Sequence, residues 1–326
     1  MLLLTKAIFA IMVGFIASAI LGLFLVPCLK KLHIGQKISI FVGESHRKKE
    51  GTPTMGGLIF IVPTIIATVA LVLTGKVSYT SNLGIVLLVF LGYALIGFLD
   101  DFLSIKKGNN EGLTTYQKLF MQVLIAIGFF YIYMRSGGQT AWVVGTLHID
   151  LEMGWLYGLF ILFVLVGASN AVNLTDGLYG LAGGLSAIAF IAFSLISLMV
   201  GFEDIGIFSL ILVGSLLGFL IYNTHPAKVF MGDTGSLALG AAMGAIAILT
   251  HRELTLLVVA GVFVIETLSV ILQTFWVTVF HKKLFLMTPI HHHFEKLGWQ
   301  ETDIVKLFWV CGLVLSMAGI IFGVWL

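Results

Sequence analysis

The chain is a series of apolar runs separated by short polar stretches. Ten runs approach the roughly 20 residues that a helix needs to cross a membrane. They cover residues 6–29, 55–74, 82–100, 118–134, 155–172, 181–200, 206–222, 235–250, 254–280 and 304–326. No polar stretch between them is long enough to form a separate domain. The pattern predicts an all-α polytopic membrane protein with about ten transmembrane helices and a single domain, residues 1–326.

The composition agrees with this pattern. Of the 326 residues, 59% are hydrophobic and 10% are charged, whereas a soluble domain carries roughly 25% charged residues. The formal charge of +2 and the lack of a basic stripe argue against a nucleic-acid partner. Cys28 and Cys311 both lie in apolar runs, which argues against a disulfide framework.

The basic residues predict an orientation. When the loop 30–50 is placed in the cytoplasm and the runs alternate, fourteen of the eighteen Lys and Arg residues lie inside, as the positive-inside rule requires. Both termini then face outward, and Asp100 and Asp101 face the cytoplasm. The outer segment 135–154 alternates partly between polar and apolar residues, which favours a short β-hairpin.

Asp100 and Asp101 are adjacent carboxylates at the end of an apolar run. A charge inside a bilayer costs about 2.5–3.5 kcal/mol even on the lenient insertion scale, so the pair needs water, a cation or a phosphate partner. A solvated helix end is the alternative. Neighbours i and i+1 point about 100° apart on a helix, so we expect one carboxylate in a cleft and the other orienting it. Scattered aspartates are typical of a Mg²⁺-phosphate enzyme, because Mg²⁺ uses few protein ligands.

The first inner loop combines basic residues, hydroxyls and glycines in the segment 45–57. Lysines supply charge, Thr52 and Thr54 supply donors, and a helix N-terminus supplies free N–H groups, so the segment suits an anion. A positive-inside anchor with a proline-assisted helix start is the alternative, and it leaves the Thr-Pro-Thr-Met-Gly-Gly string unexplained. No Walker-type lysine loop is present.

A second polar string, residues 169–178, follows the fifth run. Its amides, with the hydroxyl of Thr175 and the carboxylate of Asp176, could bind a nucleobase or a sugar. An ordinary helix cap and turn is the alternative.

The third string, residues 222–236, contains Asp233 at the start of the eighth run. Asp233 could ligate a metal where Gly232 lets the backbone approach closely, and Phe230 offers an aromatic face to a base. An N-cap aspartate with a packed phenylalanine explains the same residues.

The last inner loop carries three consecutive histidines, residues 291–293. Zinc sites use spaced ligands, so imidazoles beside phosphates fit better than zinc, and a surface run without function is the alternative. Glu266 and Gln273 are polar residues of the ninth run. They lie on one helical face and could line the same cleft.

Taken together, five strings resemble the polyprenyl-phosphate N-acetylhexosamine-1-phosphate transferases, over essentially the whole chain. The strings are residues 51–57, Asp100-Asp101, residues 173–177, residues 230–233 and residues 291–295. Each is weak alone, but their order on a ten-span chain is specific. The Thr-Pro-Thr-Met-Gly-Gly and triple-histidine strings indicate the muramoyl-pentapeptide branch.

The resemblance implies that UDP-MurNAc-pentapeptide and undecaprenyl phosphate give lipid I and UMP, with Mg²⁺, at the cytoplasmic face of a bacterial inner membrane. Both termini would then be periplasmic. The implied catalytic residues are Asp100, Asp101, Asp233, His292 and His293, with Asp233 as the Mg²⁺ ligand and Asp100 as the base for the lipid phosphate. The implied substrate-binding residues are Lys49, Thr54, Lys118, Asn173, Asp176, Gly177, Asn223, Phe230, Gln273 and His291.

Two alternatives remain. A sibling transferase would use another UDP-hexosamine. An ion-coupled transporter would use intramembrane carboxylates, but the sequence shows no internal repeat and its polar groups gather at one face. A homodimer is an expectation from the family. We favour direct attack by the lipid phosphate over an aspartyl-phosphate intermediate.

Overall fold

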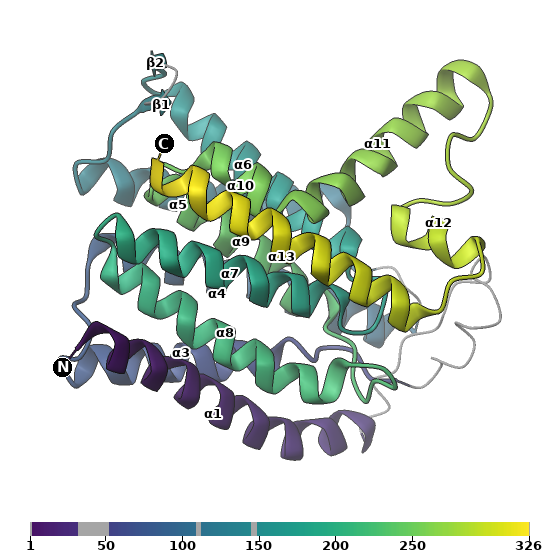
Figure 1. Ribbon diagram of the computed structural model, residues 1–326, viewed down its shortest axis with the longest axis horizontal. Coiled ribbons are helices and arrows are strands. Elements are labelled where there is room, and N and C mark those ends of the chain that lie inside the picture. The colour runs from purple at the N-terminus through teal and green to yellow at the C-terminus, as the bar shows by residue number, and fades with distance from the viewer. Residues whose placement is uncertain (1, 32–51, 109–111, 145–148, 326) are drawn as a thin grey trace.

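The computed structural model describes residues 2–31, 52–108, 112–144 and 149–325 (Figure 1). Its longer helices are α1 (Leu3–Lys31), α3 (Leu58–Leu73), α4 (Ser81–Lys107), α5 (Thr115–Arg135), α6 (Leu156–Thr175), α7 (Leu181–Met199), α8 (Glu203–Asn223), α9 (Gly232–Leu249), α11 (Gly261–Phe280) and α13 (Glu301–Trp325). The shorter elements are α10 (Glu253–Val259), α12 (Ile290–Lys296), β1 (Ala141–Val144) and β2 (Ile149–Glu152).

The prediction of a polytopic, all-helical membrane protein is confirmed. Within the described ranges, nine helices are long and apolar enough to cross a membrane, and α3 is a shorter apolar helix of 16 residues. The ninth run was predicted as one helix, and this is wrong, because the chain breaks at Ala260 into α10 and α11. The break falls inside apolar sequence, where hydropathy carries no signal.

The third helix extends beyond its predicted end at residue 100. Helix α4 continues to Lys107, and Gly108 ends it in the left-handed conformation at φ 65°. Two lysines in its last turn favour this ending, because cations stabilise a helix C-terminus. Asp100 and Asp101 therefore lie inside a helix, where their backbone positions are fixed.

Helix α9 is the centre of the bundle. In its most apolar 18 residues, 89% of the residues are buried, compared with 22% in the corresponding part of α1 at the periphery. Small residues allow its neighbours to approach closely. A Cβ added at Gly97 of α4 would lie 2.0 Å from the carbonyl oxygen of Asp233, and one at Gly240 would lie 2.2 Å from that of Ala168 on α6. The first turn of α9 is thus wedged against α4.

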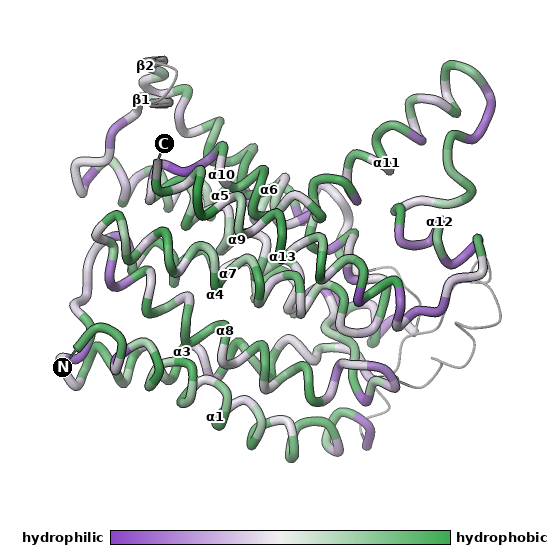
Figure 2. The backbone as a smooth tube through the Cα atoms, in the orientation of Figure 1, coloured by the Kyte–Doolittle hydropathy of each residue, from purple (hydrophilic) through white to green (hydrophobic). Residues whose placement is uncertain are grey.

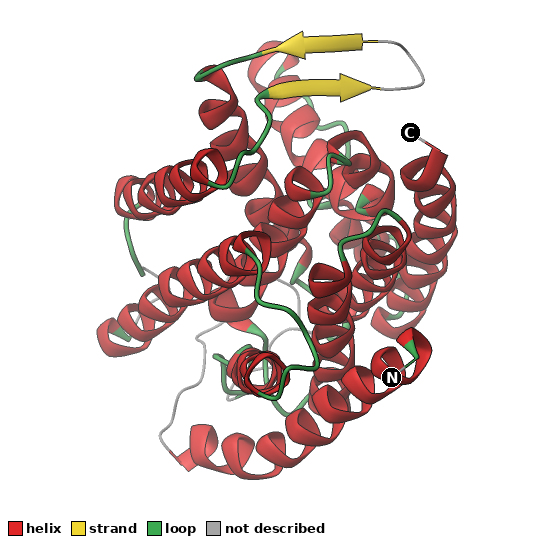
Figure 3. Ribbon diagram, turned by 90° about the vertical axis from the view of Figure 1, so that its left-hand side faces the viewer, coloured by secondary structure: helices red, strands yellow, loops and turns green. Residues whose placement is uncertain are grey.

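The two ends of the bundle differ in character. Both termini lie at the end that carries the β1–β2 hairpin, in which Trp142 pairs with Leu151 (Figures 1 and 3). The hairpin and the shared side of the termini were predicted. Helix α12 lies at the opposite end, and polar residues gather at both ends around an apolar middle (Figure 2). The assignment of these ends to periplasm and cytoplasm stays a prediction.

We predict that Gly97→Ala destabilises the protein, because the new methyl group would force α4 away from the backbone of α9. Overpacking of this kind costs about 1–3 kcal/mol. Gly167→Ala is the matched control, since a Cβ at this α6 glycine meets nothing within 4 Å and alanine favours a helix over glycine. Thermal unfolding in detergent should show a lower Tm for Gly97→Ala only. Equal Tm values would contradict the close packing of α4 on α9.

Candidate active site

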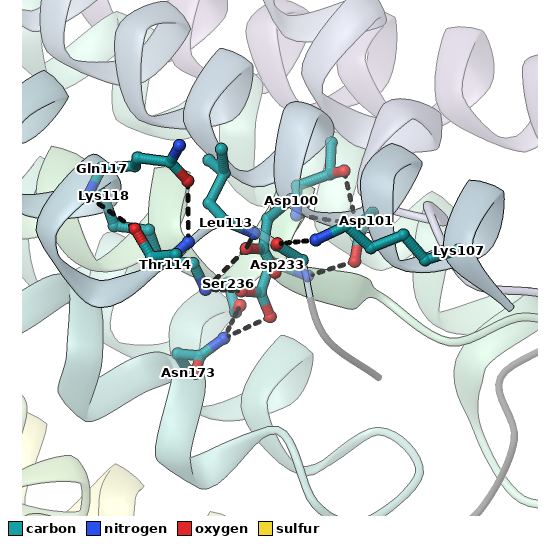
Figure 4. Close-up of polar contacts among 12 residues, drawn as sticks. Asp100, Asp101, Lys107, Leu113, Thr114, Gln117, Lys118, Asn173, Asp233 and Ser236 are labelled. Carbon is teal, nitrogen blue, oxygen red and sulfur yellow. Dashed lines mark hydrogen bonds and ion pairs between the residues drawn. The ribbon is translucent and has the colours of Figure 1, made fainter. Parts of the chain in front are cut away.

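Four helices bring their polar side chains together at one point, which we call the acidic centre. It consists of Asp100 and Asp101 from α4, Lys118 from α5, Asn173 from α6 and Asp233 from α9 (Figure 4). The Lys118 ammonium contacts two of the three carboxylates, Asp100 and Asp233, and the third, Asp101, contacts the backbone of Asp233. All five residues were predicted as site residues from separate parts of the sequence, and the fold places them in mutual contact.

Lys118 joins two of the carboxylates. Its Nζ lies 3.0 Å from Oδ1 of Asp100 and 2.8 Å from Oδ2 of Asp233. Asn173 Nδ2 donates to the other Asp233 oxygen at 2.8 Å and to Ser236 Oγ at 2.9 Å. One carboxylate oxygen of Asp100 and one of Asp233 therefore face the same position, which the Lys118 ammonium occupies and which suits a cation.

Asp101 has a different role from Asp100. Its Oδ1 accepts from the backbone N–H of Asp233 at 3.2 Å, and its Oδ2 accepts from the N–H of Thr234 at 3.0 Å and from the Thr234 hydroxyl at 2.6 Å. Asp101 is 4% exposed. It therefore caps the N-terminus of α9 from another helix and orients Asp233.

Asp100 is held from one side by the polar segment that leads into α5. Leu113 N–H donates to its Oδ1 at 2.7 Å, and a Cβ at Gly112 would lie 2.4 Å from the same oxygen. Thr114 caps α5 with a capping box that includes Gln117, and this fixes the first turn from which Lys118 points. Local sequence therefore sets the direction of Lys118.

The Thr-Pro-Thr-Met-Gly-Gly string pairs with the segment that leads into α9. Phe230 N–H donates to the Pro53 carbonyl at 2.7 Å, and Gly56 N–H donates to the Phe230 carbonyl at 2.8 Å. Thr54 is 1% exposed, and its hydroxyl has no hydrogen-bond partner among the described residues. A Cβ at Gly232 would lie 2.6 Å from that hydroxyl oxygen. Lys49, predicted at this site, lies outside the described residues.

A second cluster, which we call the aromatic cluster, lies beside this pairing. The rings of Phe230 and Tyr179 have centroids 4.9 Å apart, and His225 lies 6.0 Å from Tyr179. Tyr179 N–H donates to Glu301 at 2.7 Å, and its hydroxyl lies 3.4 Å from that of Thr52. Burial raises the pKa of Tyr179, so its hydroxyl stays protonated at neutral pH.

Sequence reasoning missed Tyr179 and Glu301. Tyr179 lies two residues beyond the polar string 173–177, and Glu301 opens the last helix. Asn223, predicted as a substrate-binding residue, holds two backbone segments together: its Oδ1 accepts from Gly180 N–H at 3.0 Å, and its Nδ2 donates to the Val229 carbonyl at 3.0 Å. It holds the loops that carry Tyr179 and Phe230.

The histidine segment, predicted to lie in a loop, forms helix α12. His291 and Glu266 are fully buried, with His291 Nδ1 3.1 Å from Glu266 Oε2. A Cβ at Gly177 would lie 2.3 Å from His291 Nε2, so the ring also abuts the loop after α6, where Asp176 is half-buried. His291 therefore ties α12 to α11 and to the end of α6.

The other predicted residues near α12 make local contacts. His292 Nδ1 lies 2.6 Å from Glu295 Oε2, and His293 Nδ1 accepts from Leu286 N–H at 3.1 Å. The Gln273 side chain accepts from the backbone N–H groups of Leu284 and Phe285 and donates to the Phe285 carbonyl. Its amide thus holds the segment that precedes α12, and a direct substrate contact stays a prediction.

An apolar groove of about 370 Å³ runs between α6, α9, α10 and α11. Val172 lines one end of it, next in sequence to Asn173 of the acidic centre, and Trp142 of the hairpin lines the other. Among the described residues that line it, Glu253 is the charged one, and its Oε1 accepts from Tyr157 at 3.0 Å. On α9 the lining stops at Gly240, one helical turn after Ser236, so this end of the groove lies near the acidic centre.

The acidic centre suits a divalent cation bound together with a phosphate ligand. Over the residues that the structure describes, no group of three or more His, Cys, Asp and Glu side chains could hold a metal alone. Mg²⁺ is usually bound by one or two carboxylates with waters and substrate phosphates. The Lys118 ammonium between Asp100 and Asp233 stands in for such a cation, so the donor set fits.

This fold and site define a polytopic membrane enzyme of the phosphoglycosyl transferase class. Residues 83–251 match the model of glycosyl transferase family 4, and residues 49–61 match a signature of phospho-N-acetylmuramoyl-pentapeptide-transferases. Proteins of that name from Bacillus velezensis and Bacillus subtilis are each 48% identical to this chain over 320 residues, which is 98% of both chains. One from Geobacillus thermodenitrificans is 48% identical over 321 residues, again 98% of both chains. The chain belongs to the phospho-N-acetylmuramoyl-pentapeptide-transferase family.

We predict that Asp101→Asn and Asp100→Asn differ in stability. In Asp101→Asn, the new amide N–H₂ would turn toward the donors at the start of α9, which should cost about 1–2 kcal/mol, as for the loss of a helix cap. Asp100→Asn keeps an acceptor for Leu113 N–H and should cost less. Thermal unfolding of the two variants checks this ranking. A larger loss of Tm in Asp100→Asn would contradict the capping role of Asp101.

Proposed function

We propose that the protein transfers phospho-MurNAc-pentapeptide from UDP-MurNAc-pentapeptide to undecaprenyl phosphate, which yields lipid I and UMP for peptidoglycan synthesis. The names of the relatives support the reaction. The single observation that carries it is the acidic centre, near which an apolar groove begins within about one helical turn, at Val172 and Gly240. A reaction between a soluble nucleotide and a lipid needs these two surfaces side by side.

The reaction exchanges one phosphoanhydride for another. An oxygen of the lipid phosphate attacks the phosphorus that bears the sugar, the bond from this phosphorus to the UMP oxygen breaks, and UMP leaves with the electron pair. Positioning and charge neutralisation supply most of the catalysis in such transfers. The acidic centre offers little covalent chemistry, since the buried Asp101 already accepts three hydrogen bonds.

Asp100 is the residue that acts on the lipid phosphate. A carboxylate repels a phosphate dianion but accepts a hydrogen bond from the monoanion, so Asp100 can take its proton before attack. The Leu113 N–H on one side of Asp100 keeps the carboxylate oriented. Direct attack by the lipid phosphate then follows without an aspartyl-phosphate.

Asp233 is the residue that would hold Mg²⁺, with the substrate diphosphate as its other ligand. Bound Mg²⁺ would neutralise charge on the diphosphate during transfer. Asp101 fixes the backbone of Asp233, and Asn173 fixes one of its oxygens. These contacts hold the carboxylate in place before substrate binds.

The aromatic cluster supports binding of uridine. Phe230 is half-buried and backed by Tyr179, so one ring face can stack on a base, and base–aromatic stacking contributes about 1–3 kcal/mol. Phe230 lies three residues before Asp233, which fits a base and a diphosphate of one nucleotide. Asp176 is assigned to the uridine, and His292 and His293 to the phosphates, by resemblance alone.

The apolar groove suits the prenyl chain of the lipid. Its lining is apolar apart from Glu253 and Thr267, and three of the helices around it, α6, α9 and α11, are long and apolar enough to cross a membrane. Each buried CH₂ group contributes about 0.8 kcal/mol, so a long prenyl chain gains much of its affinity there. Its phosphate then lies at the Val172 end, beside the acidic centre.

We predict that purified protein releases UMP from UDP-MurNAc-pentapeptide only when undecaprenyl phosphate and Mg²⁺ are both present. Asp233→Asn should lower turnover at least about 100-fold, because charge neutralisation at the diphosphate is lost. Asp303→Asn is the matched control, since Asp303 is exposed on α13 and pairs with Lys306. UMP release without the lipid would point to hydrolysis, and faster turnover with another UDP-hexosamine would favour a sibling transferase.

We predict that Gly167→Trp weakens use of long prenyl acceptors, because the indole would fill the groove. Displacing about two buried CH₂ groups should raise the KM for undecaprenyl phosphate roughly tenfold. A two-isoprene acceptor should be affected much less. Ile66→Trp on the exposed face of α3 is the control. Equal effects on both acceptors would argue against the groove as the chain site.

A further inference from the structure

Each carboxylate oxygen of Asp233 contacts a side chain from another helix. Lys118 occupies one of its carboxylate oxygens at 2.8 Å, and Asn173 occupies the other at 2.8 Å. Lys118 also lies 3.0 Å from Asp100. The ammonium therefore occupies the position that two carboxylates offer to a cation.

We propose that Lys118 is the resting counter-cation of the acidic centre and exchanges places with the divalent cation that arrives with the nucleotide. Lys118 then turns to the diphosphate. This inference rests on the proposed function, and it assigns to Lys118 a step that precedes the chemistry.

The structure favours movement of the lysine over movement of the aspartate. Asp233 lies in the first turn of α9, whose backbone is held by Asp101 and wedged against Gly97. The Lys118 side chain is 29% exposed, and its four-carbon stem can reach different partners by rotation. The ammonium can leave while both carboxylates stay in place.

The charges explain why the exchange would wait for the nucleotide. Asp100 and Asp233 would repel each other without the ammonium between them, so Lys118 stabilises the pair. Mg²⁺ loses its waters reluctantly and binds best with phosphate ligands. A diphosphate offers such ligands to the metal and a new anionic partner to the displaced lysine. Metal and nucleotide should therefore strengthen each other's binding by the same factor.

A permanent structural bridge predicts the opposite behaviour. If Lys118 only held Asp100 and Asp233 in place for the metal, removing it would loosen the site and weaken metal binding. If it competes with the metal, removing it would strengthen metal binding in the absence of nucleotide. The sign of this change separates the two roles.

The test measures binding of Mn²⁺, a spectroscopic substitute for Mg²⁺, by electron paramagnetic resonance on the full-length protein in detergent without lipid acceptor. We expect weak Mn²⁺ binding to the unchanged protein and at least tenfold tighter binding to Lys118→Met. Lys118→Arg keeps the charge and should stay within about threefold of the unchanged protein. Adding Asp233→Asn to Lys118→Met should remove the gain. Equal or weaker Mn²⁺ binding by folded Lys118→Met would overturn the proposal.

A second measurement needs no variant for its main result. With free Mn²⁺ corrected for its complex with UDP, which carries the diphosphate, saturating UDP should tighten Mn²⁺ binding to the unchanged protein at least tenfold. This coupling should fall below threefold in Lys118→Met. No coupling in the unchanged protein would also overturn the exchange. Neither measurement needs turnover, so a failure to release UMP would refute the proposed function without deciding the role of Lys118.

Discussion

The N-terminus of α9 is the constraint on which the site depends. The first N–H groups of a helix have no partner within it, and a buried helix end needs acceptors from elsewhere. Asp101 supplies them across the interface with α4. A contact that solves this folding problem also fixes the direction of Asp233, so the site is rigid where the helices pack most closely. The residues that stabilise this packing are therefore the ones to which we assign the proposed chemistry.

The apolar runs were predictable because the length of a membrane-spanning helix is a local property of the sequence. The paired aspartates were also interpretable, since adjacent helical residues cannot face the same way. Which of them contacts the start of α9 and which contacts Lys118 was not predictable, because that depends on the angle at which α4 meets α9. The break between α10 and α11 at Ala260 was not predictable either. It divides an apolar run, so hydropathy does not change there.

For the remaining site residues, the sequence did not show which side chains bind backbone and which are free to bind substrate. Asn223 and Gln273 look like ligands, since they are amides in a membrane protein, but their side chains hold backbone segments. Tyr179 stood outside every string, and only the fold shows its ring against Phe230. A buried polar side chain must find a partner, and the sequence does not say whether that partner is substrate or backbone.

The position of the acidic centre bears on the choice between an enzyme and a transporter. Its carboxylates lie where α4 nears its end and α9 begins, beside loops. A transporter needs its ionisable groups near the middle of the membrane, where both sides can reach them in turn. Here the middle is occupied by the small residues of α9 packed against α4 and α6, and by the apolar groove. The charged groups therefore lie near one end of the helices, and the described lining of the groove, apolar apart from Glu253 and Thr267, suits a lipid chain better than an ion.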